Sequence, residues 1–214
     1  MIVVVGGVKG GSGKTTIATN LAILRSQARK KVLLVDADEQ RSTSIFANQR
    51  DVLGIQTSWS TIQLAGKTIH SQISRLKPDY DDIIVDAGGR DTTSQRSALA
   101  IADIYLVPFK PRSYDVWTIS DVKTIINEMR TANPNLQAYA FINQADSKGQ
   151  DNEEALSILQ ECNEFKCLNV TIGNRKTFGN SSSDGLGVNE IKNPDKKAVE
   201  EIKSLYELIY KKCT

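Results

Sequence analysis

The chain opens with a short run of apolar residues that is followed at once by a glycine-rich turn. Residues 2–5 read Ile-Val-Val-Val, which is typical of a strand buried on both faces of a sheet. Further short apolar runs of this kind lie at residues 31–36, 81–86, 104–108, 137–142 and 168–172. Strands that alternate with helical segments predict an α/β fold, here a doubly wound and mostly parallel sheet of six strands.

The segments between these runs carry apolar residues at the spacing of an α-helix. From Lys14 onward, Ile17, Leu21 and Leu24 recur on one helical face. Other helices are expected at residues 40–48, 69–76 (before Pro78), 97–102, 116–130, 152–160 and 196–212. Trp59 is expected near the start of a strand and turn, and the polar segment 175–188 reads as a loop. A length of 214 residues fits a single domain, residues 1–214.

The turn after the first strand has the composition of a phosphate-binding loop. Residues 9–15 read Lys-Gly-Gly-Ser-Gly-Lys-Thr, between a predicted strand and a predicted helix. Small residues let backbone N–H groups converge on phosphates, and a helix N-terminus adds about half a positive charge. Lys14 is expected to reach the β- and γ-phosphates of ATP, and the Thr15 hydroxyl to ligate Mg²⁺. The expected nucleotide contacts are Lys9, Gly10, Gly11, Ser12, Gly13, Lys14, Thr15 and Thr16.

Two more predicted strands end in aspartate, Asp36 and Asp86. Because ligands bind at the carboxyl ends of parallel strands, both carboxylates are expected beside the phosphates. Asp86 ends the run at residues 81–86, which has the Walker B pattern, and would hold Mg²⁺ through a water molecule. Asp38 lies close to Asp36, and one interpretation of it is a helix N-cap before residues 40–48.

Overall composition restricts the function classes without choosing one. The formal net charge is +2, so nucleic-acid binding would need basic residues gathered on one face. No apolar run approaches the ~18 residues of a membrane span, and the N-terminus does not read as a signal peptide. Cys162, Cys167 and Cys213 miss the spacing of zinc or disulfide frameworks, which favours reduced thiols in a cytoplasm. The single histidine, His70, is expected on an exposed helix face.

Two motifs resemble the ParA/MinD family of ATPases. Residues 9–15, with a lysine ahead of the loop and Val8 where the strict pattern has glycine, resemble its deviant Walker A motif. Residues 36–40, Asp-Ala-Asp-Glu-Gln, are similar to its Asp-x-Asp-Pro-Gln motif, with Glu39 in place of proline. The resemblance implies that Asp38 positions or polarises the attacking water and that Asp36 supports the Mg²⁺ shell. It also implies that Lys9 crosses a two-fold interface to the partner's nucleotide, giving an ATP sandwich homodimer.

Other parts of the chain carry a looser version of the same resemblance. Residues 87–90 match the family's γ-phosphate-sensing turn, and residues 108–115 match a stretch at its dimer interface. Asn143 stands where a polar residue often meets adenine in the family, although it could instead cap the turn into residues 144–150. In the segment predicted as a loop, the spacing of four residues is similar to plasmid-partition ParA proteins: Arg175, Phe178, Gly185 and Val188.

The resemblance favours a ParA-type ATPase that binds double-stranded DNA without sequence preference, works with a ParB-like adaptor and positions a cargo. It would then be cytoplasmic and nucleoid-associated. No helix-turn-helix precedes the first strand, so operator-specific binding is not expected. Each lysine among the candidate DNA contacts is more simply a solvated surface cation, whereas Arg175 is at a matching family position. The candidates are Arg175, Lys176, Lys192, Lys196, Lys197, Lys203 and Lys211.

Three other functions compete with this one. A MinD-like membrane-surface ATPase is the alternative, although three glutamates in the last predicted helix disfavour contact with an anionic bilayer. An iron–sulfur reductase would need cluster cysteines at matching positions, which the three cysteines do not supply. A metabolic transferase on the same fold stays open, because a fold does not fix a function.

Overall fold

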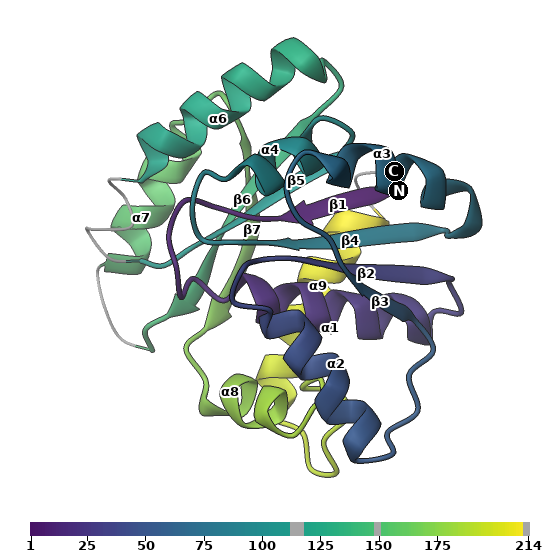
Figure 1. Cartoon of the computed structure of the whole chain (residues 1–214). Helices are drawn as coiled ribbons and strands as arrows, with labels where there is room; N and C mark the ends of the chain where they lie inside the picture. Colours follow the sequence, from purple (N-terminus) through teal and green to yellow (C-terminus); the bar gives the residue numbers. More distant parts are fainter. Residues whose placement is uncertain (112–117, 148–150, 212–214) are drawn as a thin grey trace.

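In the part of the chain that the computed structural model describes, residues 1–111, 118–147 and 151–211, seven parallel strands form one sheet (Figure 1). Their order is β3-β2-β4-β1-β5-β6-β7. The strands are β1 Ile2–Val5, β2 Val32–Ala37, β3 Ser60–Gln63, β4 Asp82–Ala87, β5 Ile104–Phe109, β6 Gln137–Ala145 and β7 Lys166–Gly173. The helices are α1 Lys14–Gln27, α2 Ser42–Val52, α3 Thr68–Leu76, α4 Thr93–Leu99, α6 Ile119–Ala132, α7 Asp151–Gln160, α8 Lys176–Ser183 and α9 Lys196–Tyr210, with a 3₁₀ turn at Lys77–Asp79.

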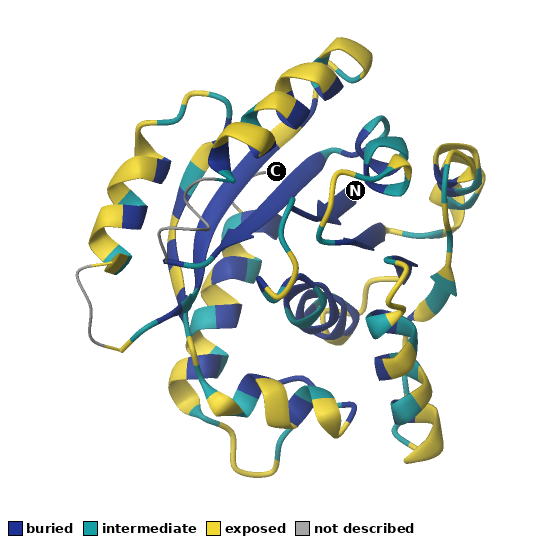
Figure 2. Ribbon diagram, turned by 60° about the vertical axis from the view of Figure 1, so that its left-hand side comes forward, coloured by how far each residue is buried: buried dark blue, intermediate teal, exposed yellow. Residues whose placement is uncertain are grey.

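Helices cover both faces of the sheet, so the central strands are apolar along their whole length. In β1, Ile2 and Val4 join the core under α3, α4, α6 and α7, whereas Val3 and Val5 join the core under α1, α2, α8 and α9. Figure 1 shows these two helical layers on opposite sides of the strands. Figure 2 shows the buried residues concentrated in the sheet and the exposed ones on the outer faces of the helices. The doubly wound α/β prediction is therefore confirmed.

Sheet register places the acidic strand ends next to the first strand. Asp36 on β2 is the register partner of Asp86 on β4, and Asp86 is also the partner of Val5 on β1. All three strands are parallel, so their carboxyl ends lie at the same edge of the sheet. The loop that follows β1 consequently starts beside both carboxylates.

The structure corrects three of the predicted elements. The sheet has a seventh strand beyond the six that were counted, because the strand expected near Trp59 forms as β3 and pairs with β2 at the edge of the sheet. Residues 175–188 are not a continuous loop, because they contain helix α8. Strand β6 runs on through Asn143 to Ala145, so Asn143 is a strand residue and not a cap of the following turn.

Some predictions concern residues outside the described part of the chain. These are residues 112–115 of the predicted interface stretch, the start of the predicted helix at residue 116, residues 148–150 of the turn after β6, the end of the last predicted helix at residue 212, and Cys213. Cys162 and Cys167 are free thiols. Among the helices of the described ranges, none has the length and apolar character needed to cross a bilayer.

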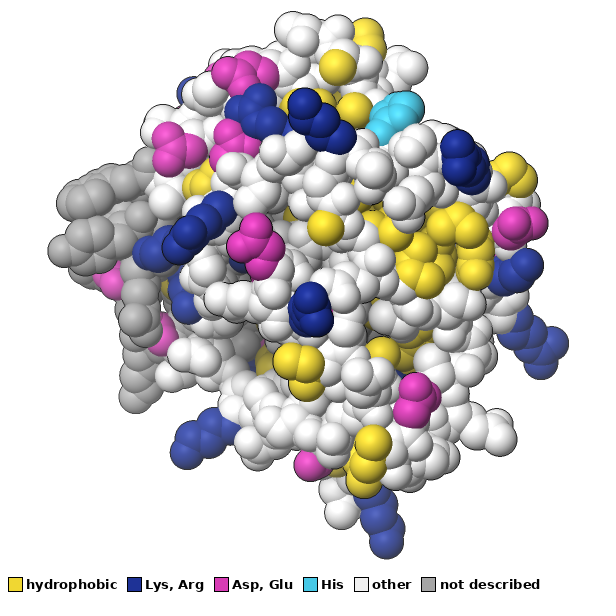
Figure 3. Space-filling model, viewed as in Figure 1, with side chains coloured by type: hydrophobic (Ala, Val, Ile, Leu, Met, Phe, Trp, Pro, Cys, Tyr) yellow, Lys and Arg dark blue, Asp and Glu magenta, His cyan; other side chains and the backbone are white. Residues whose placement is uncertain are grey.

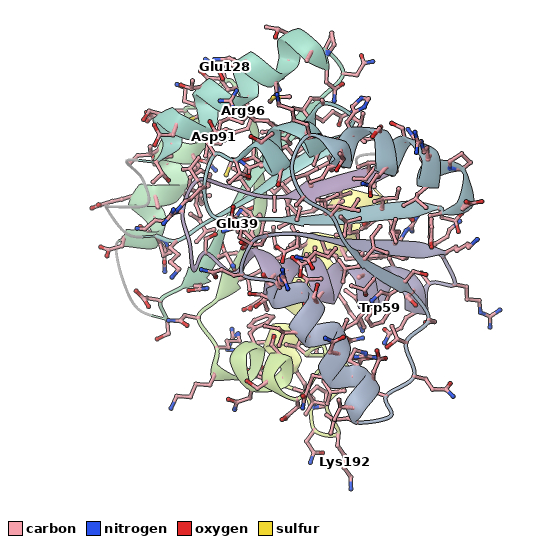
Figure 4. All side chains as sticks on the ribbon, viewed as in Figure 1. Glu39, Trp59, Asp91, Arg96, Glu128 and Lys192 are labelled. Carbon is pink, nitrogen blue, oxygen red and sulfur yellow. The ribbon has the colours of Figure 1, made fainter. Side chains whose placement is uncertain are left out.

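A buried arginine ties α2 to the segment between α8 and α9. Arg50 has 1% of its surface exposed, and its guanidinium donates to both carboxylate oxygens of Glu190 at 2.7 and 3.0 Å. It also donates to the Gly185 carbonyl at 2.8 Å. Its Cζ lies 4.7 Å from the ring centroid of Trp59, which precedes β3 (Figure 4). This bidentate contact fixes α2 against residues more than one hundred positions later in the chain.

Breaking this ion pair is expected to destabilise the fold strongly. The variant Glu190→Gln leaves the buried guanidinium without its counter-charge, and the free energy of unfolding should fall by about 3 kcal/mol. The matched control is Glu207→Gln, which removes one partner of the exposed Lys211–Glu207 pair on α9 and should change it by less than about 1 kcal/mol. Urea denaturation followed by circular dichroism measures both. Equal effects of the two variants would contradict a structural role for the Arg50 pair.

Candidate functional site

Residues 6–13 form the loop between β1 and α1 and are called the P-loop from here on. This loop leads directly into the N-terminus of α1. Gly13 is the N-cap residue of α1, and its backbone is left-handed, with φ of 85°. No side chain at this position caps the first N–H groups of the helix. The first N–H groups of α1 are therefore left for a ligand, and the helix dipole favours an anion at this position. A strand, a glycine-rich loop and a helix N-terminus in this order form an anion-binding site.

Two glycines are required because other atoms approach the loop closely. A Cβ on Gly13 would overlap the Asn143 side-chain amide. A Cβ on Gly89, in the loop after β4, would lie 2.6 Å from the backbone nitrogen of Gly10. The P-loop is thus packed between the end of β6 on one side and the loop after β4 on the other. Larger residues at either position would displace it.

Lys14, the first residue of α1, has a buried side chain that reaches back over the loop. Its Nζ donates to the Lys9 carbonyl oxygen at 2.8 Å. Burial lowers the pKa of its amine, while the nearby carboxylates of Asp86 and Asp38 act in the opposite direction. The amine therefore lies near a loop carbonyl and two carboxylates, and the negative charge of phosphate oxygens bound there would attract it further.

Asp86 is fully buried, with 0% of its surface exposed, as is Asp36. Its Oδ2 accepts hydrogen bonds from the hydroxyls of Thr15 and Thr43, each at 2.7 Å. Burial raises its pKa to about 7, although the two hydroxyls lower it. Its Oδ1 is buried and has no hydrogen-bond partner among the described residues.

These surroundings fit a magnesium ion bound together with phosphates. An unpartnered carboxylate oxygen next to a threonine hydroxyl is an incomplete set of hard oxygen ligands. Within the described ranges, no group of three or more His, Cys, Asp or Glu side chains could hold a metal ion. Magnesium commonly completes its octahedron with water and substrate phosphates, so Thr15 and Asp86 suffice as protein contacts.

Asp36 lies directly beside Asp86 but uses its oxygens within the protein. Its Oδ2 accepts from the backbone N–H and the hydroxyl of Ser44, at 2.7 and 2.6 Å. Its Oδ1 accepts from the backbone N–H of Asp38 at 3.2 Å. Asp36 therefore holds the start of α2 and the turn that carries Asp38, which suits a supporting position around a metal better than direct ligation.

Asp38 lines a cavity of about 560 Å³ that opens above the P-loop. Its Oδ1 accepts from the Gln40 backbone N–H at 3.1 Å and lies 3.2 Å from where a Cβ on Gly88 would be. It does not cap α2, whose N-cap position is Arg41. Other lining residues of the cavity include Gly10, Gly11, Gly13, Lys14, Thr15, Glu39, Gly88, Gly89 and Arg90.

The loop after β4, residues 88–92, is held at its far end by an ion-pair network on two helices. Arg96 of α4 contacts both carboxylate oxygens of Asp91 at 2.6 Å, and its Nη1 lies 2.6 Å from the Glu128 carboxylate of α6. Figure 4 shows these three side chains together at the top of the sheet. The loop thus connects the P-loop, through Gly89, with helices on the opposite side of the sheet.

A second cavity, of about 300 Å³, adjoins the first at the amino end of α1. Gly13 and Gln144 line both cavities, and Thr16, Asn143, Arg175 and Phe178 line the second. Asn143 is 4% exposed, and its Nδ2 donates to the Ser12 carbonyl at 2.6 Å. The first cavity could take phosphates above the P-loop, and the neighbouring second cavity has room for a base beside Asn143.

Arg175, a candidate DNA contact from the sequence, is paired with acidic side chains of its own chain. Its guanidinium donates to both carboxylate oxygens of Glu201 and lies 3.8 Å from Asp195. Its charge is therefore offset by two acids, and its place is in the wall of the second cavity. The candidate DNA contacts that are exposed in the structure are Lys176, Lys192, Lys196, Lys197, Lys203 and Lys211.

Several residues around the P-loop were not predicted from the sequence. Thr43 and Ser44 follow the acidic motif as a hydroxyl-rich run and bind the two buried carboxylates. Gln95 accepts the Gly7 backbone N–H at 3.0 Å from 88 residues away. The Lys110 amine lies 3.7 Å from where a Cβ on Gly11 would be, so β5 brings a further cation to the loop. Only the hydroxyl-rich run offered a local signal.

Comparisons with known proteins identify the family of this chain. The family model of the CobQ/CobB/MinD/ParA nucleotide binding domain matches residues 2–188. "Maintenance of carboxysome distribution protein A" of Halothiobacillus neapolitanus is 24% identical over 205 residues, 94% of this chain and 92% of that protein. Protein ParA of Rhizobium radiobacter is 29% identical over 141 residues, 66% of this chain and 63% of that protein.

Solved structures show the same fold. Apo McdA from Cyanothece matches with a TM-score of 0.78 at 18% identity, covering 95% of this chain and 98% of that one. A putative plasmid partition protein from Borrelia burgdorferi bound to AMPPNP matches with a TM-score of 0.78 at 21% identity. The match covers 99% of this chain and 98% of that one. Since the family model spans most of the chain and includes the P-loop and both acidic strand ends, the chain belongs to the CobQ/CobB/MinD/ParA family of nucleotide-binding domains, as an ATPase of the ParA/MinD kind.

Proposed function

We propose that this protein is a ParA-type positioning ATPase whose ATP-bound copies pair as a sandwich homodimer and separate after hydrolysis. The observation that carries the proposal is the unequal placement of the two P-loop lysines. Lys14 lines the phosphate cavity of its own chain, and its amine donates to the Lys9 carbonyl oxygen. A second lysine side chain at the same phosphates would crowd two cations, so the Lys9 side chain would serve the phosphates of a second copy.

A lysine supplied by the partner would couple ATP binding to pairing. Charge builds on the phosphoryl oxygens during transfer, and a cation brought in across an interface stabilises it in the same way as an arginine finger. Each Lys9 would lie against the triphosphate of the other copy, so that ATP joins the two subunits. Loss of the γ-phosphate would remove that interaction and release them.

The remaining catalytic roles follow from positions around the cavity. Asp38 lies beside Gly88 at the phosphate end, where its carboxylate can orient the attacking water. Thr15 and Asp86 would hold Mg²⁺ against the β- and γ-phosphates, with Asp36 behind them. Lys14 would neutralise the same oxygens from within the chain. Asn143 lines the second cavity, which supports its predicted place beside the adenine.

The cargo and partners of this ATPase are proposed from its relatives and from its exposed lysines. The relatives named above include plasmid-partition and carboxysome-distribution proteins, so the cargo class is a DNA molecule or a protein compartment. Lysines at the α8–α9 end would bind DNA phosphates without reading sequence. Lys192, in the segment between α8 and α9, extends away from the body of the protein (Figure 4). A ParB-like adaptor would stimulate hydrolysis.

The distribution of basic residues over the surface indicates which face could bind DNA. On the face shown in Figure 3, Lys and Arg are scattered and interspersed with Asp and Glu. Lys196, Lys197 and Lys203 instead lie on the exposed side of α9. Because phosphate contacts are electrostatic and act over about 10 Å at moderate salt, a few lysines brought together by dimerisation would be enough.

The MinD-like membrane alternative is disfavoured by the packing of the last helix. Ile202, Leu205 and Ile209 on α9 are fully buried in the core under the sheet. An amphipathic helix binds a bilayer with an exposed apolar face, and the apolar face of α9 is already used by the domain. The described part of α9 thus has no spare apolar stripe for a membrane.

Replacing Lys9 is expected to weaken pairing strongly. In an Asp38→Ala background, which should slow ATP turnover, the protein should dimerise with ATP and stay monomeric with ADP. Adding Lys9→Ala should weaken the dimer about 100-fold, the effect of removing one partner of a buried charge pair. The matched control Lys77→Ala removes an exposed lysine from the 3₁₀ turn and should leave dimerisation unchanged. Sedimentation velocity measures both, and normal pairing of the Lys9 variant would rule out the sandwich.

DNA binding is expected only in the ATP state. Random-sequence duplex DNA should be retained by the Asp38→Ala protein with ATP and not with ADP or without nucleotide. Replacing Lys196, Lys197 and Lys203 by alanine should lower affinity and reduce the salt slope by about 0.9 for each phosphate that the variant no longer neutralises. The control double variant Lys67→Ala/Lys77→Ala should change neither the affinity nor the salt slope. Equal DNA binding in all nucleotide states, or pelleting with anionic liposomes instead of DNA, would contradict the proposal.

A further inference from the structure

The end of β6 contains an irregularity directly beside the P-loop. Asn143 pairs with Ile172 of β7, and the next pair is Ala145 with Gly173, so Gln144 is skipped in the register. The backbone of Gln144 is left-handed, with φ of 56°. Residues other than glycine rarely adopt this conformation, and asparagine tolerates it better than most. A strained residue in a strand next to a ligand site points to a functional constraint.

The left-handed turn directs two neighbouring amides to one loop. Asn143 Nδ2 donates to the Ser12 carbonyl at 2.6 Å, and Gln144 Nε2 donates to the Gly11 carbonyl at 3.1 Å. Consecutive side chains of a regular strand point to opposite faces of the sheet. The irregularity at Gln144 therefore allows both carboxamides to reach adjacent carbonyls of the P-loop.

These two hydrogen bonds determine which way the loop's N–H groups face. The described peptide bonds are trans, so each C=O points opposite to the N–H of the next residue in the same peptide plane. Holding the Gly11 carbonyl towards β6 turns the Ser12 N–H the other way. Holding the Ser12 carbonyl does the same for the Gly13 N–H. Backbone N–H groups of such a loop are the donors that receive phosphate oxygens.

Gln144 also lies where the two cavities meet. It lines both of them, and its Nε2 lies 3.1 Å from where a Cβ on Gly13 would be. A nucleotide that extends from one cavity into the other must pass this side chain. We propose that Gln144 is a positioning residue for nucleotide binding: its strained backbone aims a carboxamide at the Gly11 carbonyl and thereby presets the P-loop N–H groups for phosphate.

The test separates the carboxamide from the backbone conformation. Gln144→Asn keeps an amide and suits a left-handed residue, but it is one methylene too short to hold the Gly11 carbonyl. Its melting temperature should equal or exceed that of the unmodified protein, while its Kd for mant-ATP with Mg²⁺ rises about tenfold, the loss expected for one hydrogen bond. Gln160→Asn, on the exposed end of α7, is the matched control and should change neither quantity.

A second pair of variants excludes a merely structural role. Gln144→Gly relieves the backbone strain and Gln144→Ala retains it, so the glycine variant should melt at the higher temperature. Both lack the carboxamide, so both should bind mant-ATP about equally weakly. The proposal is overturned if Gln144→Asn binds like the unmodified protein, or if affinity recovers in Gln144→Gly together with stability. Titrations use the full chain without DNA, in the monomer range, so that their outcome does not depend on dimerisation.

Discussion

One buried carboxylate connects the parts of this site. Asp86 accepts hydrogen bonds from Thr15 at the start of α1 and from Thr43 at the start of α2, while its own backbone belongs to β4. It lies away from solvent, its pKa is raised to about 7 by burial, and one of its oxygens has no hydrogen-bond partner among the described residues. A buried acid in this condition favours a cation beside it. The P-loop, the metal position and α2 thus share one electrostatic centre.

The parallel sheet makes this arrangement possible. Neighbouring β1, β4 and β2 end at the same edge, so Asp36 and Asp86 meet in register although fifty positions separate them in the chain. Asp36 then fixes Ser44 and Asp38, which places the start of α2 and the proposed catalytic acid. From its other end, α2 is held by Arg50 and Glu190. Helix α2 is therefore attached at its start to Asp86 and at its end to the α8–α9 segment.

The sequence predicted the parts of this structure that depend on local pattern. Apolar strand runs, the P-loop composition and acids at strand ends are short-range signals, and the structure places them as expected. The sequence did not predict α8, because only Phe178 and Ser181 of that helix are buried and its apolar residues do not recur at helical spacing. The partners Arg175–Glu201 and Arg50–Glu190 join distant residues, so no local pattern indicates them. The left-handed backbone of Gln144 is likewise a consequence of strand pairing.

Since Asp86 accepts hydrogen bonds from both Thr15 and Thr43, binding of MgATP beside Asp86 is expected to stabilise the start of α2. Amide hydrogen exchange of peptides covering residues 42–52, measured with MgATP and with ATP plus EDTA, tests it most directly. The account predicts greater protection of α2 with MgATP, because a ligand that binds the folded site stabilises it. It also predicts that this difference is lost in Thr43→Val, which removes the hydroxyl between α2 and Asp86. Protection of α2 that is the same with and without Mg²⁺, or unchanged in Thr43→Val, would contradict the account.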